Sequence, residues 1–413
     1  MKQYMVKMTG VFLIMAFAMS VTIPVHASGH PTVNVEGYIS YQPRNFQQYG
    51  AMQTGNELQV DLIHRDHLGI DHDLYTTWAD GSGNYKFDNI ENWFYADQSR
   101  LNVIIRVRTS NPKTSVTNRL FDPYVFDTPT PVSLLTDYYT YWITPAITAS
   151  SSSYAAIWIF EDIRNAWHFV NNNYASYDPG NVNAIWEPGL DCFPFDLNKL
   201  TDLIKLPDCN SAFTYGGTVP PHFIWISNYQ NGISMDTVIH ETGHMYMVNS
   251  PNKGWYTGCL THSIFTANNV NCAWFEGWAD FFPLAVNNDP CYNVLKVIAC
   301  TGIKDQDYYN LEVHSRTDTD PNFNKGPAVE GRVAGALYDL YDNTNEGYDR
   351  ISAGFYPIAH IALGNSPINT FWDFWNNWNS SSGQNQLLSG LTLWWNTINF
   401  IYWTYLPTVL KNP

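Results

Sequence analysis

The chain carries two histidines and a glutamate at a spacing suited to hydrolytic metal chemistry. His240, Glu241 and His244 form an HExxH pattern. Residues four apart share one face of an α-helix, so the two imidazoles project side by side and match two corners of a tetrahedral zinc site. Glu241 stands next to the first of them, where a general base can reach metal-bound water. The stretch therefore predicts a catalytic zinc centre.

A third protein ligand is needed, because a catalytic zinc keeps three protein ligands and one open position. The segment 274–282 supplies a candidate, since Glu276 and Asp280 are also four apart and a helix places both carboxylates on one face. Glu276 can ligate the metal, while Asp280 accepts the free ring N–H of a ligating histidine. A competing pattern has a third histidine six residues after His244, but Ser250 stands there.

Regular elements are expected around these residues. Apolar residues at a 3.6-residue period predict helices, and short apolar runs predict strands. The expected helices cover residues 154–174, 237–248, 274–282, 328–341, 370–378 and 391–402. A strand is expected at 222–227, just before the first metal-binding helix. Residues 154–413 are thus expected to form one mainly α, α+β domain.

The two motifs resemble those of a known group of enzymes. HETGH followed by EGWAD is similar to the gluzincin metallopeptidases, the thermolysin-like class, and EGWAD comes closest to the fungalysin-type branch; the resemblance covers about residues 220–345. It implies a thermolysin-like fold, zinc as the cofactor, and a protein or peptide as the substrate. It also implies that the strand 222–227 borders the cleft and pairs with substrate backbone. The acidic motif that aminopeptidases of the class carry on this strand is absent, which favours cleavage within chains.

Peptide hydrolysis also needs a donor that stabilises the tetrahedral oxyanion. In fungalysin-like enzymes, a histidine shortly before a comparable helix takes this role. The nearest such residue here is His314, fourteen residues upstream of Ala328, and that gap departs from the family pattern. Tyr338, Tyr256 and Arg332 are alternatives for the same task.

Residues 31–128 are expected to form an all-β sandwich. Apolar and polar residues alternate at 33–41, 58–63 and 101–108, as half-buried strands require. Residues 76–87 have the pattern of a strand, a glycine-rich turn and a second strand. Their Asp-Gly-x-Gly-x-Tyr-x-Phe phrase resembles that of transthyretin-like sandwich modules, in which it forms a hairpin.

Two further segments are rich in polar residues. The stretch 129–153 contains many Pro, Thr and Ser residues and is expected to link the sandwich to the domain 154–413. Residues 318–324 place oxygen-bearing side chains at alternate positions, which suits a calcium loop. A plain polar loop is the alternative.

The first 27 residues have the form of a signal peptide. Lys2 and Lys7 precede the apolar run 11–19, and residues 25–27 make a suitable cleavage site. An uncleaved membrane anchor is the alternative, but the run is short for a span and no later segment is long enough. An exported, secreted protein is therefore expected. The net charge of −16 disfavours nucleic acid as a partner.

Six cysteines, all in the second half, suit disulfide bonds in an exported protein. Nearest-neighbour pairing would join Cys192 to Cys209, Cys259 to Cys272, and Cys291 to Cys300. The bridge between Cys259 and Cys272 would steady the loop between the two metal-binding segments. Ligation of zinc by thiols is the alternative, but no CxxC pair is present.

The sequence leaves more than one function open. The first is a secreted zinc metallopeptidase, an endopeptidase with an accessory β-sandwich, in which Glu241 is the general base. The second is a surface-binding or adhesion protein with a catalytically degenerate peptidase-like domain. A third is autoprocessing, with residues 31–128 as a propeptide that shields the cleft. The intact set of His240, Glu241, His244 and Glu276 favours the first.

Overall fold

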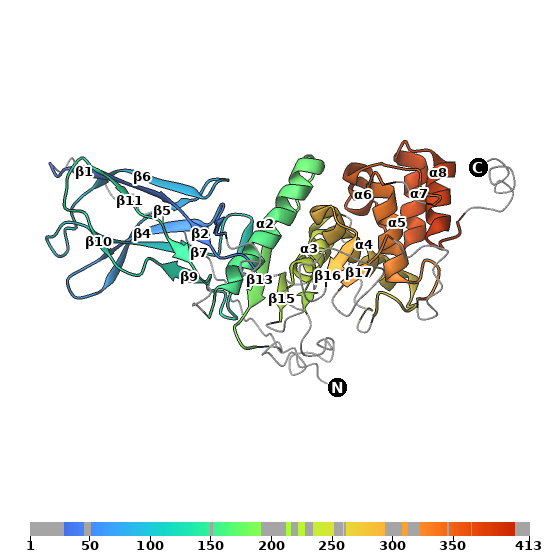
Figure 1. Cartoon of the computed structure of the whole chain (residues 1–413), viewed down its shortest axis with the longest axis horizontal. Coiled ribbons are helices and arrows are strands. Elements are labelled where there is room, and N and C mark those ends of the chain that lie inside the picture. The colour runs from blue at the N-terminus through green and yellow to red at the C-terminus, as the bar shows by residue number, and fades with distance from the viewer. Residues whose placement is uncertain are drawn as a thin grey trace, which may run out of the picture.

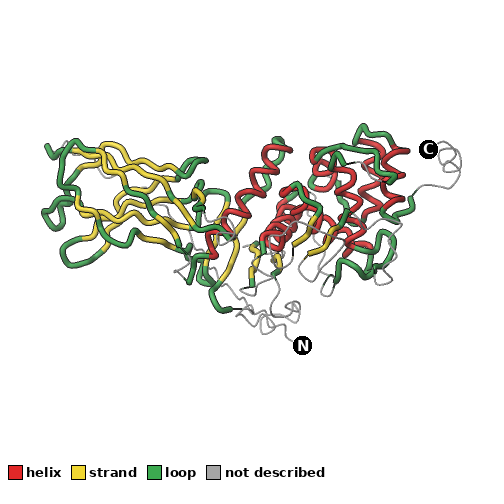
Figure 2. Tube along the Cα trace, viewed as in Figure 1, coloured by secondary structure: helices red, strands yellow, loops and turns green. Residues whose placement is uncertain are grey.

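The structure is a computed structural model. It describes residues 29–44, 51–148, 152–190, 212–215, 222–227, 234–251, 259, 262–293, 308–312, 323–344, 347–364 and 366–400. A β-rich region comes first and a helical region follows it (Figure 1, Figure 2). The predicted signal peptide, 1–27, lies outside the described residues, as does the predicted calcium loop, 318–324, apart from its last two residues. Among the described helices, none is long and apolar enough to cross a membrane.

The β-rich region is made of short strands. They are β1 (Thr32–Tyr38), β2 (Ser40–Tyr41), β3 (Gln53–Thr54), β4 (Gln59–Arg65), β5 (Asp71–Trp78), β6 (Asn84–Glu91), β7 (Asn102–Arg108), β8 (Thr114–Thr117), β9 (Val125–Asp127), β10 (Val132–Ser133), β11 (Thr140–Trp142) and β12 (Ala146–Ile147). All but β8 belong to sheets with the orders β11-β1-β6, β10-β7-β4-β5 and β12-β2-β3, with β9 paired beside β7. The strands predicted at 33–41, 58–63 and 101–108 are confirmed.

Buried apolar side chains on these strands form the core of the region. Val33 and Val35 of β1 are buried, and so are Val60 and Leu62 of β4, while their neighbours in β1 stay partly exposed. Side chains two apart lie on one face of a strand, so each strand contributes an apolar row to a shared interior. Figure 1 shows β1, β6 and β11 running above β4, β7 and β10.

The predicted hairpin at 76–87 is wrong in its pairing. β5 pairs with β4, and β6 pairs with β1, so the glycine-rich turn connects two sheets instead of closing one ladder. Within the turn, the Asp80 carboxylate accepts the backbone N–H groups of Ser82 and Asn84, each within 2.9 Å. Local residues therefore fix the turn, while long-range pairing decides which strands it joins.

The stretch 129–153, predicted as a linker, contributes strands of its own. β10 pairs with β7, β11 runs parallel to β1, and β12 runs parallel to β2. The residues between the β-rich and helical regions thus complete the sheets that precede them.

A further sheet borders the helical region and has the order β14-β15-β13-β8. It contains β13 (Val182–Trp186), β14 (Phe213–Tyr215) and β15 (Phe223–Ile226). The strand predicted at 222–227 is present as β15, but its expected free edge is not: β13 pairs along one side and β14 along the other. Because both backbone edges are occupied, β15 has no edge for substrate pairing, and that prediction is wrong.

The helical region begins beside this sheet (Figure 1). Its elements are α2 (Ala155–Asn173), α3 (Met235–Asn249), α4 (Val270–Asn287), α5 (Glu330–Tyr341), α6 (Phe355–Ala362), α7 (Phe371–Ser381) and α8 (Gln386–Trp395), with a short ladder of β16 (Cys291–Asn293) and β17 (Tyr308–Asn310). The predicted helices at 154–174, 328–341 and 370–378 correspond to α2, α5 and α7. The helix predicted at 391–402 stops at Trp395, because Asn396 caps it and Thr397 adopts a positive φ of 66°.

Candidate metal centre

The HExxH residues lie on α3, a helix whose start is capped by its own sequence. The Ser234 hydroxyl accepts the Thr237 backbone N–H at 3.2 Å, which satisfies one of the helix's unpaired donors. One turn further on, His240 and His244 are both buried, and their ring centroids lie 4.8 Å apart. The helix thus presents two imidazoles on one face, as their four-residue spacing predicts.

The EGWAD residues lie on α4, which packs directly against α3. The Trp278 indole N–H donates to the Gly243 carbonyl at 3.2 Å, and both groups are buried. A Cβ atom on Gly243 would lie only 3.0 Å from the Phe282 ring, so the glycine allows the close approach of the two helices. This approach brings Glu276 to the histidine pair.

The geometry converges on one carboxylate oxygen. Glu276 Oε2 lies 3.0 Å from His244 Nε2 and 3.4 Å from His240 Nε2. One potential ligand atom from each of the three residues lies within 4.8 Å of the others, so the group could hold a metal ion. Two imidazoles and a carboxylate are a donor set that zinc accepts, so the residues present fit that ion.

Asp280 lies where the sequence places it, one turn beyond Glu276. Its Oδ1 atom is 3.1 Å from His240 Nδ1, the ring nitrogen that faces away from Glu276. A carboxylate at that nitrogen orients the imidazole so that its other nitrogen points toward a metal.

The charge distribution also favours a cation. Burial raises the pKa of Glu276, yet the charges of His244 and His262 and its hydrogen bonds outweigh burial and hold that pKa well below its ordinary value. Burial lowers the pKa of His240, but the nearby carboxylates of Asp280 and Glu276 outweigh it and raise that pKa. The carboxylates at this buried position therefore favour a positive charge beside them.

Glu241 contacts β14, the end strand of the sheet β14-β15-β13-β8 among the described residues. The Thr214 hydroxyl, on β14, is 2.8 Å from the Glu241 carboxylate and 2.9 Å from its backbone carbonyl. Both side chains are buried. A hydroxyl from a neighbouring strand thus fixes the direction of this carboxylate, a contact that the sequence did not predict.

His262 and Glu330 also reach the centre, and sequence reasoning missed both. His262 Nδ1 lies 3.0 Å from Glu330 Oε2, and its Nε2 lies 3.7 Å from Glu276 Oε2. Burial lowers the pKa of His262, but the Glu276 charge and the Glu330 hydrogen bond outweigh it and raise that pKa to about 9. The one available signal was that His262 follows Cys259 by three residues, in the loop between α3 and α4.

The predicted disulfide between Cys259 and Cys272 is confirmed, with Cα atoms 5.3 Å apart. Cys272 lies in the first turn of α4, one turn before Glu276, and the two sulfur atoms and a Glu276 oxygen lie within 4.8 Å of one another. Because the sulfur atoms are bonded to each other, they offer no thiolate to a metal. The pairings predicted for 192–209 and 291–300 involve cysteines outside the described residues.

Two of the alternatives for the oxyanion donor, Arg332 and Tyr338, lie within the described residues. The Arg332 guanidinium donates to the Asn324 carbonyl at 3.1 Å and stacks on the Phe323 ring at 3.7 Å. Tyr338 is buried, with a pKa raised by that burial and by nearby acidic groups. Tyr256 and His314 lie outside the described residues.

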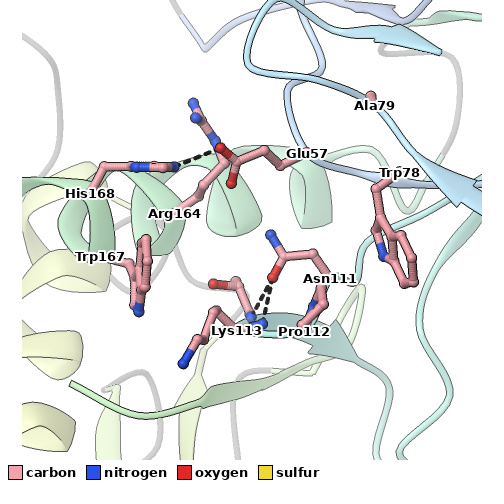
Figure 3. A pocket seen from close by; sticks show the side chains of 10 residues that line it. Glu57, Trp78, Ala79, Asn111, Pro112, Lys113, Arg164, Trp167 and His168 are labelled. Carbon is pink, nitrogen blue, oxygen red and sulfur yellow. Dashed lines mark hydrogen bonds and ion pairs between the residues drawn. The ribbon is translucent and has the colours of Figure 1, made fainter. Parts of the chain in front are cut away.

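A cavity of about 370 Å³ lies between the β-rich region and α2 (Figure 3). Trp78 and Trp167 line it, and His168 Nε2 lies 2.7 Å from Glu57 Oε1 at its wall. None of its lining residues belongs to the group around Glu276, so the cavity is separate from the candidate metal centre.

Comparison with known proteins gives one family match. Residues 213–396, less than half of the chain, match the mycolysin C-terminal domain. The match includes α3, α4 and α5 and gives the helical region a metallopeptidase-related context. No curated protein matches the chain.

A search of solved structures aligns the chain with a 9R-lipoxygenase from Cyanothece PCC8801 at 9% identity and a TM-score of 0.21. The alignment covers 37% of this chain and 26% of the lipoxygenase. It is too weak to indicate a shared fold.

Proposed function

We propose that this chain is a zinc-dependent metallopeptidase that hydrolyses peptide bonds within protein substrates. The observation that carries the proposal is the convergence of His240, His244 and Glu276 at ligand distance, with Glu241 on the same helix. Bound zinc would supply Lewis-acid chemistry, polarising the scissile carbonyl and acidifying water. The side chains of the site would hold the ion and transfer the proton.

The residues around the centre divide these tasks. His240, His244 and Glu276 would hold the ion, and Asp280 would orient His240. Glu241 would take a proton from the attacking water and pass it to the leaving amine. The Thr214 hydroxyl, at 2.8 Å, supports this role because it keeps the carboxylate aimed in one direction.

The substrate would bind as an extended peptide beside β14. In the described part of the chain, β14 is the end strand of its sheet and pairs only with β15. A free strand edge accepts an extended peptide through backbone hydrogen bonds. Thr214 lies on β14 and contacts Glu241, so a peptide paired there would run close to the general base. We place the substrate edge at β14 instead of the strand at 222–227.

The proposed domain organisation is based on the sequence. We propose that residues 1–27 are a signal peptide removed on secretion, and that 31–128 form a transthyretin-like sandwich. The stretch 129–153, whose strands β10, β11 and β12 pair with strands of this sandwich, leads to a proposed thermolysin-like peptidase domain, 154–413. A calcium ion at 318–324 stays a prediction.

The test combines metal analysis with proteolysis. Wild-type protein should bind one zinc ion per chain and cleave unfolded casein, whereas Glu241→Gln should bind zinc and lose about 1,000-fold in kcat. The matched control is Glu36→Gln on β1, a partly exposed residue outside the site. A wild-type protein that binds zinc but cleaves nothing would favour the binding protein with a degenerate peptidase-like domain. Wild-type protein without metal would overturn the proposal.

A further inference from the structure

A buried carboxylate beside the metal centre has a histidine as its partner. Glu330 is the first residue of α5 and is only 4% exposed. Its two carboxylate oxygens lie 3.0 and 3.3 Å from His262 Nδ1. Burying a carboxylate is unfavourable unless it is hydrogen-bonded and charge-compensated, so this pair is a fixed unit.

The other ring nitrogen of His262 faces the centre. Nε2 lies 3.7 Å from Glu276 Oε2, the same oxygen that contacts His240 and His244. His262 is not one of the residues whose ligand atoms converge within 4.8 Å. Its side chain is 35% exposed, against 9% for Glu276, so the imidazole stands between the buried ligands and solvent. A substrate must approach from a solvent-accessible side.

The loop that carries His262 is held in place. The Gly331 N–H donates to the Ile264 carbonyl at 3.1 Å, and the Asn268 N–H donates to the Ala328 carbonyl at 2.7 Å. A Cβ on Gly331 would lie 2.6 Å from the Ile264 carbonyl oxygen, so only glycine permits this contact without movement. These bonds tie the loop to the start of α5, where Glu330 stands.

The disulfide adds a second anchor. Cys259, three residues before His262, is bonded to Cys272 on α4. The imidazole is thus positioned by α4 through a covalent bond and by α5 through hydrogen bonds. A catalytic donor must be oriented in advance in this way, because reorganisation during the reaction would cost activation energy.

We propose that His262 is a catalytic residue whose Nε2–H donates to the substrate carbonyl oxygen as negative charge develops on it, and that Glu330 is its positioning residue. Nδ1 is held by the Glu330 carboxylate, which leaves Nε2, on the side of Glu276, to donate to the substrate. The inference rests on the proposed function, because it assumes a metal at Glu276. It assigns the donor to the loop between the two metal-binding helices.

Two measurements test it on the full chain, with His262→Gln and Glu330→Gln as variants. The first is the dissociation constant of acetohydroxamate for cobalt-substituted protein, read from the visible spectrum, since this ligand places oxygen atoms at the metal. The second is casein cleavage, with kcat and KM separated. His360→Gln, an exposed histidine on α6, is the matched control.

We expect the wild type and all three variants to bind the same amount of metal. His262→Gln should lose about 100-fold in kcat with little change in KM, and should bind acetohydroxamate about 10-fold more weakly. Glu330→Gln should show the same pattern with a smaller loss, and His360→Gln should match the wild type.

Unchanged kcat and unchanged acetohydroxamate affinity in His262→Gln would overturn the inference while leaving the metallopeptidase proposal intact. Loss of metal from a folded His262→Gln protein would also overturn it, because the residue would then be a ligand. Should His262→Gln fail to fold by circular dichroism, Glu330→Gln decides by the same two criteria. Wild-type protein that binds no metal would overturn the proposed function and this inference together.

Discussion

A single carboxylate oxygen links the residues of the candidate centre. Glu276 Oε2 has three imidazole nitrogens within 3.7 Å, from His240, His244 and His262. Only two of these rings belong to the group that could hold a metal. The third is on a different element and has a different carboxylate partner, Glu330. His240 and His262 therefore differ in the carboxylate that contacts the second ring nitrogen, which is Asp280 for His240 and Glu330 for His262.

Asp280 gives a prediction at this scale. Replacing it with asparagine removes the charge beside His240 Nδ1 while keeping the side-chain size. We expect Asp280→Asn to weaken zinc affinity by about 10-fold, because the imidazole becomes less basic and less firmly oriented. Competition with a chromophoric chelator measures the change, with the exposed Asp88→Asn as control. Equal affinities for Asp280→Asn and wild type would contradict the orienting role.

At the scale of elements, close helix packing assembles the centre. α3 supplies the histidines, α4 supplies Glu276 and Asp280, and α5 supplies Glu330. Gly277, next to Glu276, lies against α5: a Cβ there would be 2.6 Å from Val333 Cβ and 2.8 Å from the Glu330 carbonyl oxygen. The glycine of EGWAD thus serves the packing of α4 on α5.

Gly277→Ala should therefore destabilise the protein. The added methyl group cannot be accommodated by rotating a side chain, because one of the crowded atoms is backbone. We expect the free energy of unfolding to fall by about 1–3 kcal/mol, as for other overpacked interiors. Urea denaturation measures it. Gly81→Ala, where no atom lies within 4 Å of the new Cβ, should change little, and equal stability of both variants would contradict the packing argument.

Buried carboxylates make the stability of the whole molecule depend on pH. Burial raises the pKa of Glu161 and of Asp236 to about 7, and the pKa of Asp349 to about 6. A carboxyl group with a raised folded-state pKa binds its proton more tightly in the folded state than in the unfolded state. Its contribution to stability is complete below the unfolded pKa and is lost as pH rises through the folded pKa. These groups therefore favour the folded state at mildly acidic pH.

Asp349→Asn tests this dependence. Asp349 is fully buried and accepts the Thr392 hydroxyl at 3.0 Å. The stability difference between variant and wild type should shift in favour of the variant between pH 4 and pH 7, by up to about 3 kcal/mol. Urea denaturation of both proteins across this range measures the shift. A difference that stays constant with pH would contradict the raised pKa.

Some of this architecture is predictable because it depends on residues near one another in the chain. Four-residue spacing brings His240 beside His244 and Glu276 beside Asp280, since a helix has 3.6 residues per turn. Alternation predicts β1, β4 and β7 for the equivalent reason in strands. The disulfide between Cys259 and Cys272 spans only a short loop.

The sequence by itself therefore determined the two candidate metal-binding motifs, the core strands of the β-rich region and the order of β-rich and helical regions. Tertiary structure alone decided that β5 and β6 join different sheets, that β14 covers the edge of β15, and that Glu330 meets His262. Each of these depends on contacts between residues far apart in the chain. Their pairing is selected by the burial and hydrogen bonding of the assembled fold, which no local pattern encodes.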